Sequence, residues 1–495
     1  MKRNRLRPGT SGDAVLLMFI KLVTIALGLV VTRLLSEHLS VYDYGTYSQI
    51  LLIVSTVTSL TVLGMMDGVN YFYCRETDVQ KRERYMSTIF ALQCAVSTAA
   101  GCVVMVLSAP LCTHFNNPHI AKLLIFAAAL PLLQNLLSML QILLVSVGKA
   151  RLLAVRNFVV SVARLAVVIV VVTLIQNVAV ILLTTVVLDA VQIVLFGVIL
   201  RRSGCAMRLR AVKPGLFGEI FRYCAPMAVF TAVSTLNRDL DKYLIGMMTD
   251  TETLAVYSNA SKVLPFDIIM TSFTTVLIPQ ITRFVAEKNW EKAGALYKVF
   301  LEISYVSTGI LCCAALAVSP QMMQLLYTEK YLSGLSVFCL YILVDLLRFT
   351  NITLVLSAAG KTKSLMFLGV GALGVNAVLN VVLYRLMGIS GPAVATLLTT
   401  LGSGVLILHL GAKELHTGMG RFFDLKYLAL FVLESLAATS LLFYVQSRMA
   451  AAGIGYLIIL VAVGGIYGVG MLALNGKRLL RALKTVNQVT KREDG

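Results

Sequence analysis

Lysine and arginine residues alternate in density along fourteen long apolar segments, and this pattern constrains the fold of the chain more than any other feature. The segments span residues 13–35, 43–66, 86–108, 119–146, 153–175, 178–199, 222–248, 252–282, 296–318, 332–358, 364–384, 390–410, 427–446 and 454–474. The intervening loops were sorted alternately, with Lys122, Arg156, Arg222 and Lys298 at the segment ends counted with their loops. The group that contains both termini then holds 32 lysines and arginines, whereas the other group holds 4. Because basic residues stay on the cytoplasmic side during insertion, we expect both termini to be cytoplasmic and the number of crossings to be even.

The composition also indicates a membrane protein. Apolar residues make up 58% of the chain and charged residues only 14%, and each segment can cross the roughly 30 Å hydrocarbon core as a helix. Continuous apolar runs favour helices over a barrel, whose strands alternate in polarity. We therefore predict an all-α integral membrane protein with 14 transmembrane helices.

The net charge of +19 lies largely in short basic clusters next to the apolar segments. Anionic lipid headgroups explain such clusters, so membrane lipids are expected partners and nucleic acid is not. The N-terminal stretch MKRNRLRPGTSGD precedes a long apolar segment without a small-residue cleavage site, which predicts a retained first helix. The nine cysteines show no CxxC spacing, so neither a disulfide framework nor a metal site is expected.

The chain contains an internal repeat. Three pairs of short motifs recur at equivalent places in the predicted topology, two of them 210 residues apart and the third 212. The pairs are Gly45–Gln49 with Ala255–Asn259, Pro110 with Pro320, and Val147–Ala150 with Ala359–Thr362. A nearly constant offset predicts duplication. Because each half holds six segments, the halves should share one orientation and be related by an axis along the membrane normal, as in transporters that work by alternating access.

This repeat predicts the domain organisation. We expect an N-lobe over 1–200, a cytoplasmic linker over 201–221, a C-lobe over 222–412, two further helices over 413–475, and a basic cytoplasmic tail over 476–495.

Three stretches carry a family resemblance. They are Leu27–Tyr47 (LGLVVTRLLSEHLSVYDYGTY), Asn237–Ala260 (NRDLDKYLIGMMTDTETLAVYSNA) and Ser357–Thr399. The third is the most specific, because it combines Gly-Lys after the tenth segment, two asparagines in the eleventh, and GxxGxAxAT leading into the twelfth. Together they resemble the polysaccharide (oligosaccharidyl-lipid) flippases of the multidrug/oligosaccharidyl-lipid/polysaccharide exporter superfamily.

The resemblance implies two pseudo-symmetric six-helix lobes followed by two C-terminal helices. It also implies translocation of an undecaprenyl-(pyro)phosphate-linked oligosaccharide across the bacterial cytoplasmic membrane for cell-surface polysaccharide biosynthesis. Relatives receive the glycan-phosphate head in a cationic cavity between the lobes. In the lipid II flippase branch the two extra helices line a groove for the polyprenyl tail. Polysaccharide polymerase or assembly proteins are implied partners, and no cofactor is implied.

Besides the four residues counted with the loops, seven basic residues lie inside the apolar segments. Each would cost about 2.5–3.5 kcal/mol at the bilayer centre, so we expect them to face a wet cavity or an acidic partner. In order of expected exposure to a substrate cavity, they are Lys21, Arg238, Lys242, Arg164, Lys262, Arg348 and Arg33.

Acidic neighbours provide an alternative for all of these residues except Lys21, namely a buried ion-pair network that fixes helix register. The possible partners are Asp239 and Asp241 for Arg238 and Lys242, Asp345 for Arg348, Glu37 for Arg33, Asp189 for Arg164, and Asp267 for Lys262. Lys21 lies about 12 Å into the first segment at 1.5 Å per residue, with no acid nearby on its helix. An anionic pyrophosphate requires such a fixed charge in low dielectric.

Other polar residues in the segments also have two interpretations. Asp267 and Asp345 could bind a coupling ion or carry protons, or could be structural partners of basic residues. Asn70, Asn376 and Asn380 would suit sugar hydroxyls, yet asparagines also join membrane helices.

Three other functions agree less well with the sequence: a multidrug exporter, an enzyme and a scaffold. A multidrug exporter coupled to cations would need uncompensated acids at depth, whereas basic residues outnumber acids there. An enzyme acting on lipid-linked sugars would need a large outer loop with clustered catalytic groups, and the outer loops are short. The sequence Ala358–Thr362 ends like a phosphate-binding loop, but Val355 replaces the required first glycine, so no nucleotide is expected. A scaffold would leave Lys21 unexplained.

Overall fold

The computed structural model describes residues 11–76, 78–147, 149–202, 207–262, 264–266, 280–285, 287–349 and 352–491. All regular elements in these ranges are helices, which confirms the all-α fold class. Among the described residues, nine helices are long and apolar enough to cross a membrane, and two bent helix pairs also pass this test. The exact number of fourteen crossings stays a prediction.

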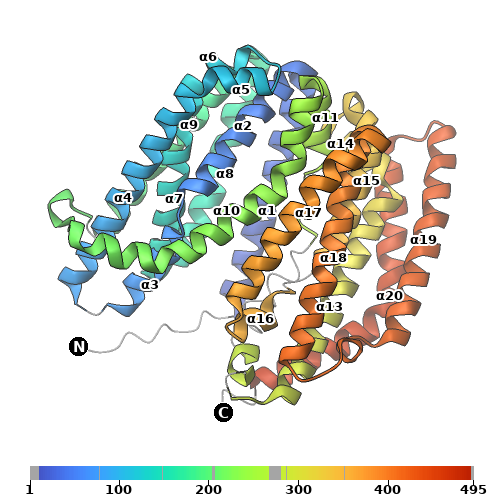
Figure 1. The fold of residues 1–495 in the computed structure, drawn as a ribbon. Coiled ribbons are helices and arrows are strands. Elements are labelled where there is room, and N and C mark those ends of the chain that lie inside the picture. Colours follow the sequence, from blue (N-terminus) through green and yellow to red (C-terminus); the bar gives the residue numbers. More distant parts are fainter. Residues whose placement is uncertain are drawn as a thin grey trace. The chain divides into compact units, whose positions relative to one another are not determined.

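The chain forms two compact units, Met1–Ala255 (unit 1) and Val256–Gly495 (unit 2). Figure 1 shows the helices of unit 1 from blue to green and those of unit 2 from green to red. Unit 1 contains α1 (Ser11–His38), α2 (Val41–Thr61), α3 (Met65–Arg75), α4 (Val79–Val106), α5 (Ser108–His114), α6 (His119–Ala127), α7 (Leu130–Ser146), α8 (Ala150–Leu174), α9 (Val178–Arg202) and α10 (Phe217–Met248). The division falls within α11 (Thr251–Ala260).

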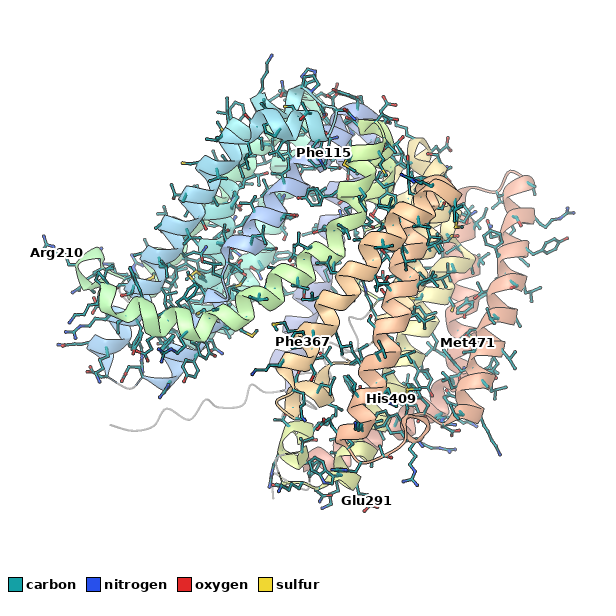
Figure 2. The ribbon with its side chains drawn as sticks, viewed as in Figure 1. Phe115, Arg210, Glu291, Phe367, His409 and Met471 are labelled. Carbon is teal, nitrogen blue, oxygen red and sulfur yellow. The ribbon has the colours of Figure 1, made fainter. Side chains whose placement is uncertain are left out.

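Unit 2 contains α13 (Trp290–Ala317), α14 (Ser319–Tyr327), α15 (Leu335–Leu347), α16 (Leu354–Ala358), α17 (Thr362–Met387), α18 (Gly391–Glu414), α19 (Leu425–Ala451) and α20 (Tyr456–Lys491). Large apolar side chains cover the outer faces of many helices, as with Phe367 in α17, which is 69% exposed (Figure 2). Such faces suit contact with lipid tails.

The core of unit 1 joins α3, α4, α7, α9 and the start of α10. Val69, Ile89, Leu143, Leu200 and Ile220 are fully buried in it. Helix α1 packs against α8, and α10 packs against α2 and α3. Packing thus places α10 with unit 1, although the repeat predicts it as the first helix of the C-lobe.

Two bent spans meet inside unit 1. The pair α2–α3 bends by 42°, and α10 bends by 50° between Ala225 and Met227, where the sequence has Pro226. Gly64 lies at the first bend with φ +67°, and a β-carbon there would lie 2.5 Å from the carbonyl oxygen of Cys224. Only glycine combines this backbone conformation with so close an approach.

The repeat appears in the order and length of the helices. The long helices α4 and α13 both have 28 residues. Each is followed by a short helix that contains the matched proline, Pro110 in α5 and Pro320 in α14. The matched tyrosines, Tyr47 and Tyr257, are both buried.

An arginine links the C-terminal helices to the rest of unit 2. The Nε of Arg478 in α20 lies 2.5 Å from Glu302 in α13, and its Nη2 lies 2.6 Å from Asp424 at the start of α19. Its guanidinium also stacks on Tyr427, 3.6 Å from the ring centre. The hydrogen bond from Arg478, followed by that from the Tyr427 backbone, lowers the pKa of Asp424 below its ordinary value. This contact therefore joins α13, α19 and α20.

We predict that Gly391→Ala destabilises unit 2 by about 2–3 kcal/mol, a typical cost of overpacking. A β-carbon at Gly391 would lie 2.2 Å from the carbonyl oxygen of Leu383, so the turn between α17 and α18 would have to open. Thermal unfolding in detergent measures the loss. Gly402→Ala in α18 is the matched control, because nothing lies within 4 Å of its added β-carbon. Equal melting temperatures for both variants would contradict the prediction.

Candidate substrate-binding site

Arg238, Asp239 and Lys242 form a charged cluster on α10, inside a membrane segment. Asp239 accepts from Arg238 Nη2 at 3.1 Å through Oδ2 and from Lys242 Nζ at 2.9 Å through Oδ1. The side chain of Asp239 is only 6% exposed, that of Lys242 is 19% exposed, and that of Arg238 is 50% exposed. One buried carboxylate therefore holds two cations, and the three residues together carry one net positive charge.

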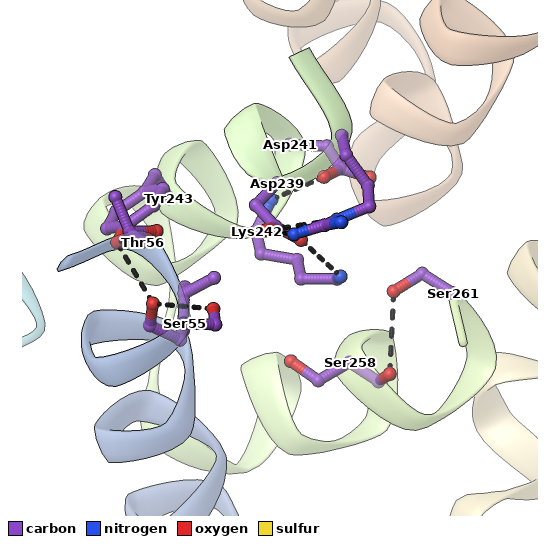
Figure 3. A network of polar contacts seen from close by, with 10 residues as sticks. Ser55, Thr56, Asp239, Asp241, Lys242, Tyr243, Ser258 and Ser261 are labelled. Carbon is purple, nitrogen blue, oxygen red and sulfur yellow. Dashed lines mark hydrogen bonds and ion pairs between the residues drawn. The ribbon is translucent and has the colours of Figure 1, made fainter. Parts of the chain in front are cut away.

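The cluster is fixed against α2 by the adjacent tyrosine. Tyr243 donates to Thr56 Oγ1 at 2.8 Å, a contact drawn in Figure 3, and lies 3.3 Å from the carbonyl oxygen of Leu52. Asp241, also predicted as a partner of the two cations, is 1% exposed and accepts from the backbone N–H of Lys242 at 2.8 Å. Asp239 thus pairs with both predicted cations.

Arg238 can contact an anion without leaving Asp239. Its Nε and Nη2 face the carboxylate, and a guanidinium has further donors. Half of the side chain is exposed. Because arginine binds phosphate oxygens through two parallel hydrogen bonds, this geometry suits a phosphate group.

Arg164 and Asp189 line a second polar region in unit 1, a pocket of about 370 Å³ bounded by α2, α7, α8 and α9. Asp189 accepts from Gln192 Nε2 at 3.2 Å. Arg164 is exposed and lies close enough to Asp189 and to the hydroxyl of Tyr47 for electrostatic interaction. The predicted proximity of Arg164 and Asp189 is therefore present.

The polar face of α7 continues this pocket into a neighbouring one. Ser138 and Gln141 line both the first pocket and a second of about 480 Å³, which also contains Asp67 and Asn70. Asn70 accepts from Ser146 at 3.1 Å. The sequence pattern indicated Asn70 but neither Asp67 nor this face of α7. The spacing of Gln134, Ser138 and Gln141, one helical face in an apolar helix, was the available signal.

Arg156 was also missed, because it lies near the end of the fifth apolar segment. Its guanidinium stacks on Phe196 at 4.5 Å and interacts electrostatically with Asp189. A position close to the predicted boundary made it resemble an ordinary flanking arginine.

The remaining predicted residues are dispersed. In α1, Arg33 pairs with Glu37 at 3.1 Å, whereas the side chain of Lys21 lies outside the described part. In unit 2, Lys262 is exposed, Arg348 is half-buried at the end of α15, and Asp345 accepts from the Leu264 backbone at 3.1 Å. Asp267 lies outside the described residues. Asn380 donates to Asn376 at 3.0 Å, and both are buried. No group of three potential metal ligands occurs among the described residues.

Comparison with known proteins assigns the chain to a family. A family model described as "Polysaccharide biosynthesis protein" matches residues 30–335. A search of the curated proteins found no match.

Solved structures with the same fold include three transport proteins. The lipid II flippase MurJ, in an inward closed conformation, aligns with a TM-score of 0.76 at 14% identity, covering 94% of this chain and 100% of that chain. An inward-facing MATE family multidrug resistance transporter aligns with a TM-score of 0.62 at 14% identity, covering 78% and 94%. A MOP superfamily transporter from Pyrococcus furiosus aligns with a TM-score of 0.59 at 12% identity, covering 83% and 97%.

The fold is that of a multi-pass helical membrane protein and is shared with MurJ and a MATE family transporter. The chain belongs to the polysaccharide biosynthesis protein family, whose model spans more than half of its length. The resemblance found in the sequence is confirmed at the level of family and fold. The proteins that share this fold are flippases and transporters and not enzymes, in agreement with the prediction.

Proposed function

We propose that this protein moves an undecaprenyl-(pyro)phosphate-linked oligosaccharide from the inner to the outer leaflet of the bacterial cytoplasmic membrane. The observation that supports this most directly is Arg238, a half-exposed cation fixed within a membrane helix by the buried Asp239. Family membership supports polysaccharide biosynthesis as the pathway class. The internal repeat supports alternating access, and the distribution of basic residues supports cytoplasmic termini.

Electrostatics explain why such a cation suits a pyrophosphate. Two unit charges 4 Å apart attract by about 1 kcal/mol in water, but by about 4 kcal/mol at the effective dielectric near protein. An arginine within the membrane therefore attracts a phosphate group more strongly than an arginine in bulk water would. The hydroxyl and amide groups of α7 that line the pocket with Arg164 can accept and donate hydrogen bonds to sugar hydroxyls.

The decisive experiment is deletion of the gene followed by identification of the lipid-linked glycan that accumulates. We expect undecaprenyl-linked oligosaccharide to accumulate in the inner leaflet, with loss of the corresponding surface polysaccharide. Unchanged lipid-linked glycans, combined with increased sensitivity to cationic drugs, would instead favour the multidrug exporter. That alternative is weakened by Asp239, because two cations already compensate this acid.

We predict that Arg238→Ala lowers glycan export by about tenfold, since one charge-assisted contact to phosphate contributes roughly 1.5–3 kcal/mol. Asp239 keeps Lys242 as a partner in this variant, so protein abundance should change little. Surface polysaccharide at equal protein level provides the measurement, and Arg238→Lys should restore part of the activity. Arg385→Ala, an exposed arginine near the end of α17, is the matched control. Parental export in Arg238→Ala would remove this residue from the site.

A further inference from the structure

A pocket of about 740 Å³ lies in unit 2 and is lined by none of the residues of the candidate substrate-binding site. It is formed by the segment that leads into α13 and the segment that follows α18, and Glu291, labelled in Figure 2, lies on its wall. Both segments belong to the loop group that the basic residues predict to be cytoplasmic. Leu415 and Phe422 line it with side chains that are 2% and 1% exposed.

Two of the side chains that line the pocket, Lys288 and His416, lie at unusual helix ends. Helices commonly end on a glycine in the left-handed region, but here the corresponding residues are Lys288, with φ +57°, and His416, with φ +51°. At each end, hydrogen bonds close the turn: Asn289 N to Phe284 O at 2.9 Å, and Thr417 N to Ala412 O at 2.9 Å. Strained residues other than glycine often occur at ligand sites. The two turns place a lysine and a histidine on the pocket instead of bare backbone.

Positive charge predominates in the pocket. Lys288, Lys298 and Arg421 line it together with Glu287 and Glu291. Glu287 forms an ion pair with Arg283 at 2.8 Å, so its charge is largely compensated. Next to these cations stands Trp290, half-buried against the hydrophobic core and in edge contact with His416 at 5.3 Å between ring centres. Cations beside an aromatic ring form a recurring arrangement for phosphate compounds that also carry a planar or apolar part.

We propose that this pocket binds a phosphate-bearing ligand, with Lys288, Lys298 and Arg421 contacting the phosphate and Trp290 contacting the remainder. Its volume falls in the range of small-molecule sites, roughly 300–1,000 Å³. The phosphate can belong to an anionic lipid headgroup at the membrane surface or to a soluble pyrophosphate compound. This inference is independent of the proposed transport function, because it concerns residues of unit 2 that the proposed function does not use.

Trp290 makes a direct test possible, since it is the single tryptophan of the chain. Full-length protein in neutral detergent would be titrated with inorganic pyrophosphate, with ADP, and separately with phosphatidylglycerol in mixed micelles. Sodium chloride at matched ionic strength and phosphatidylcholine serve as blanks. We expect a saturable change in Trp290 emission with a phosphate probe and none with the blanks, and calorimetry would detect binding that leaves the emission unchanged. A response to phosphatidylglycerol alone identifies a lipid site, and a response to pyrophosphate or ADP identifies a soluble ligand.

Substitutions distinguish a specific binding site from nonspecific electrostatic attraction. Arg421→Gln and Lys288→Gln should each raise the dissociation constant about tenfold, as expected for loss of a charged hydrogen bond. Lys292→Gln is the matched control. Lys292 lies in the first turn of α13, close in sequence to Lys288, and it is exposed but does not line the pocket. Its dissociation constant should stay within about twofold of the parent. Absence of saturable binding by both methods, or equal weakening in Lys292→Gln, would overturn the proposal.

Discussion

Replacing Lys21 by alanine is expected to abolish glycan export while leaving the amount of protein in the membrane unchanged. Lys21 lies in α1 about 12 Å along the helix from its predicted cytoplasmic boundary, and no acid lies within one turn of it in the sequence. A lysine at that depth costs about 2.5–3.5 kcal/mol. Because no acid lies within one turn of Lys21 in the sequence, its removal should relieve the fold of this cost, so any lost export reflects function and not stability.

Three variants make this test specific. Lys21→Arg should retain part of the export because it keeps the charge, whereas Lys21→Met keeps much of the length but not the charge and should be as inactive as Lys21→Ala. Lys122→Ala, at an exposed position in α6, controls for loss of a single positive charge. Surface polysaccharide would be compared at equal protein level. Full export in Lys21→Ala would exclude this residue from the substrate site.

Unlike Lys21→Ala, Asp239→Ala should lower the stability of the protein and its amount in the membrane. This carboxylate pairs with Arg238 and Lys242 while only 6% of its side chain is exposed. Breaking a buried pair by removing one partner typically costs about 3–5 kcal/mol, because the remaining charge is buried without compensation. We expect a lower melting temperature in detergent and a several-fold lower abundance in the membrane.

A second substitution separates lost pairing from lost packing. In Asp239→Ala/Lys242→Met the least exposed cation is also removed, so part of the stability should return. Glu252→Ala, an exposed acid in the first turn of α11, controls for the loss of one negative charge. A double variant as unstable as Asp239→Ala alone would show that charge compensation is not the role of Asp239.

The sequence predicted the positions of the helices better than it predicted the contacts between them. Helices or helix pairs lie at the predicted segments within the described ranges, because apolar length and basic flanks are properties of each segment alone. The repeat was visible for the same reason, since Pro110 and Pro320 occupy equivalent local positions. The family resemblance rested on local motifs, of which Leu27–Tyr47 and Asn237–Ala260 lie almost wholly within the residues 30–335 that the family model matches.

Contacts between helices depend on rotation about each helix axis, which local sequence encodes weakly. The sequence identified acids near Arg238 and Lys242, but not that Asp239 would pair with both. Arg156 was treated as a flanking residue, although it stacks on Phe196 within the helix pair α8–α9. The pocket around Trp290 could not be predicted, because its walls come from segments more than 100 residues apart.

The guanidinium of Arg478 has a consequence for any study of motion in this protein. Because it fastens α20 to Glu302 of α13 and to Asp424 at the beginning of α19, these three helices should travel as one rigid body. A spectroscopic label on the outward side of α20 would thus report displacement of unit 2 as a whole. A chain truncated before residue 478 would lose these ion pairs, and the same label would then report local motion of α20.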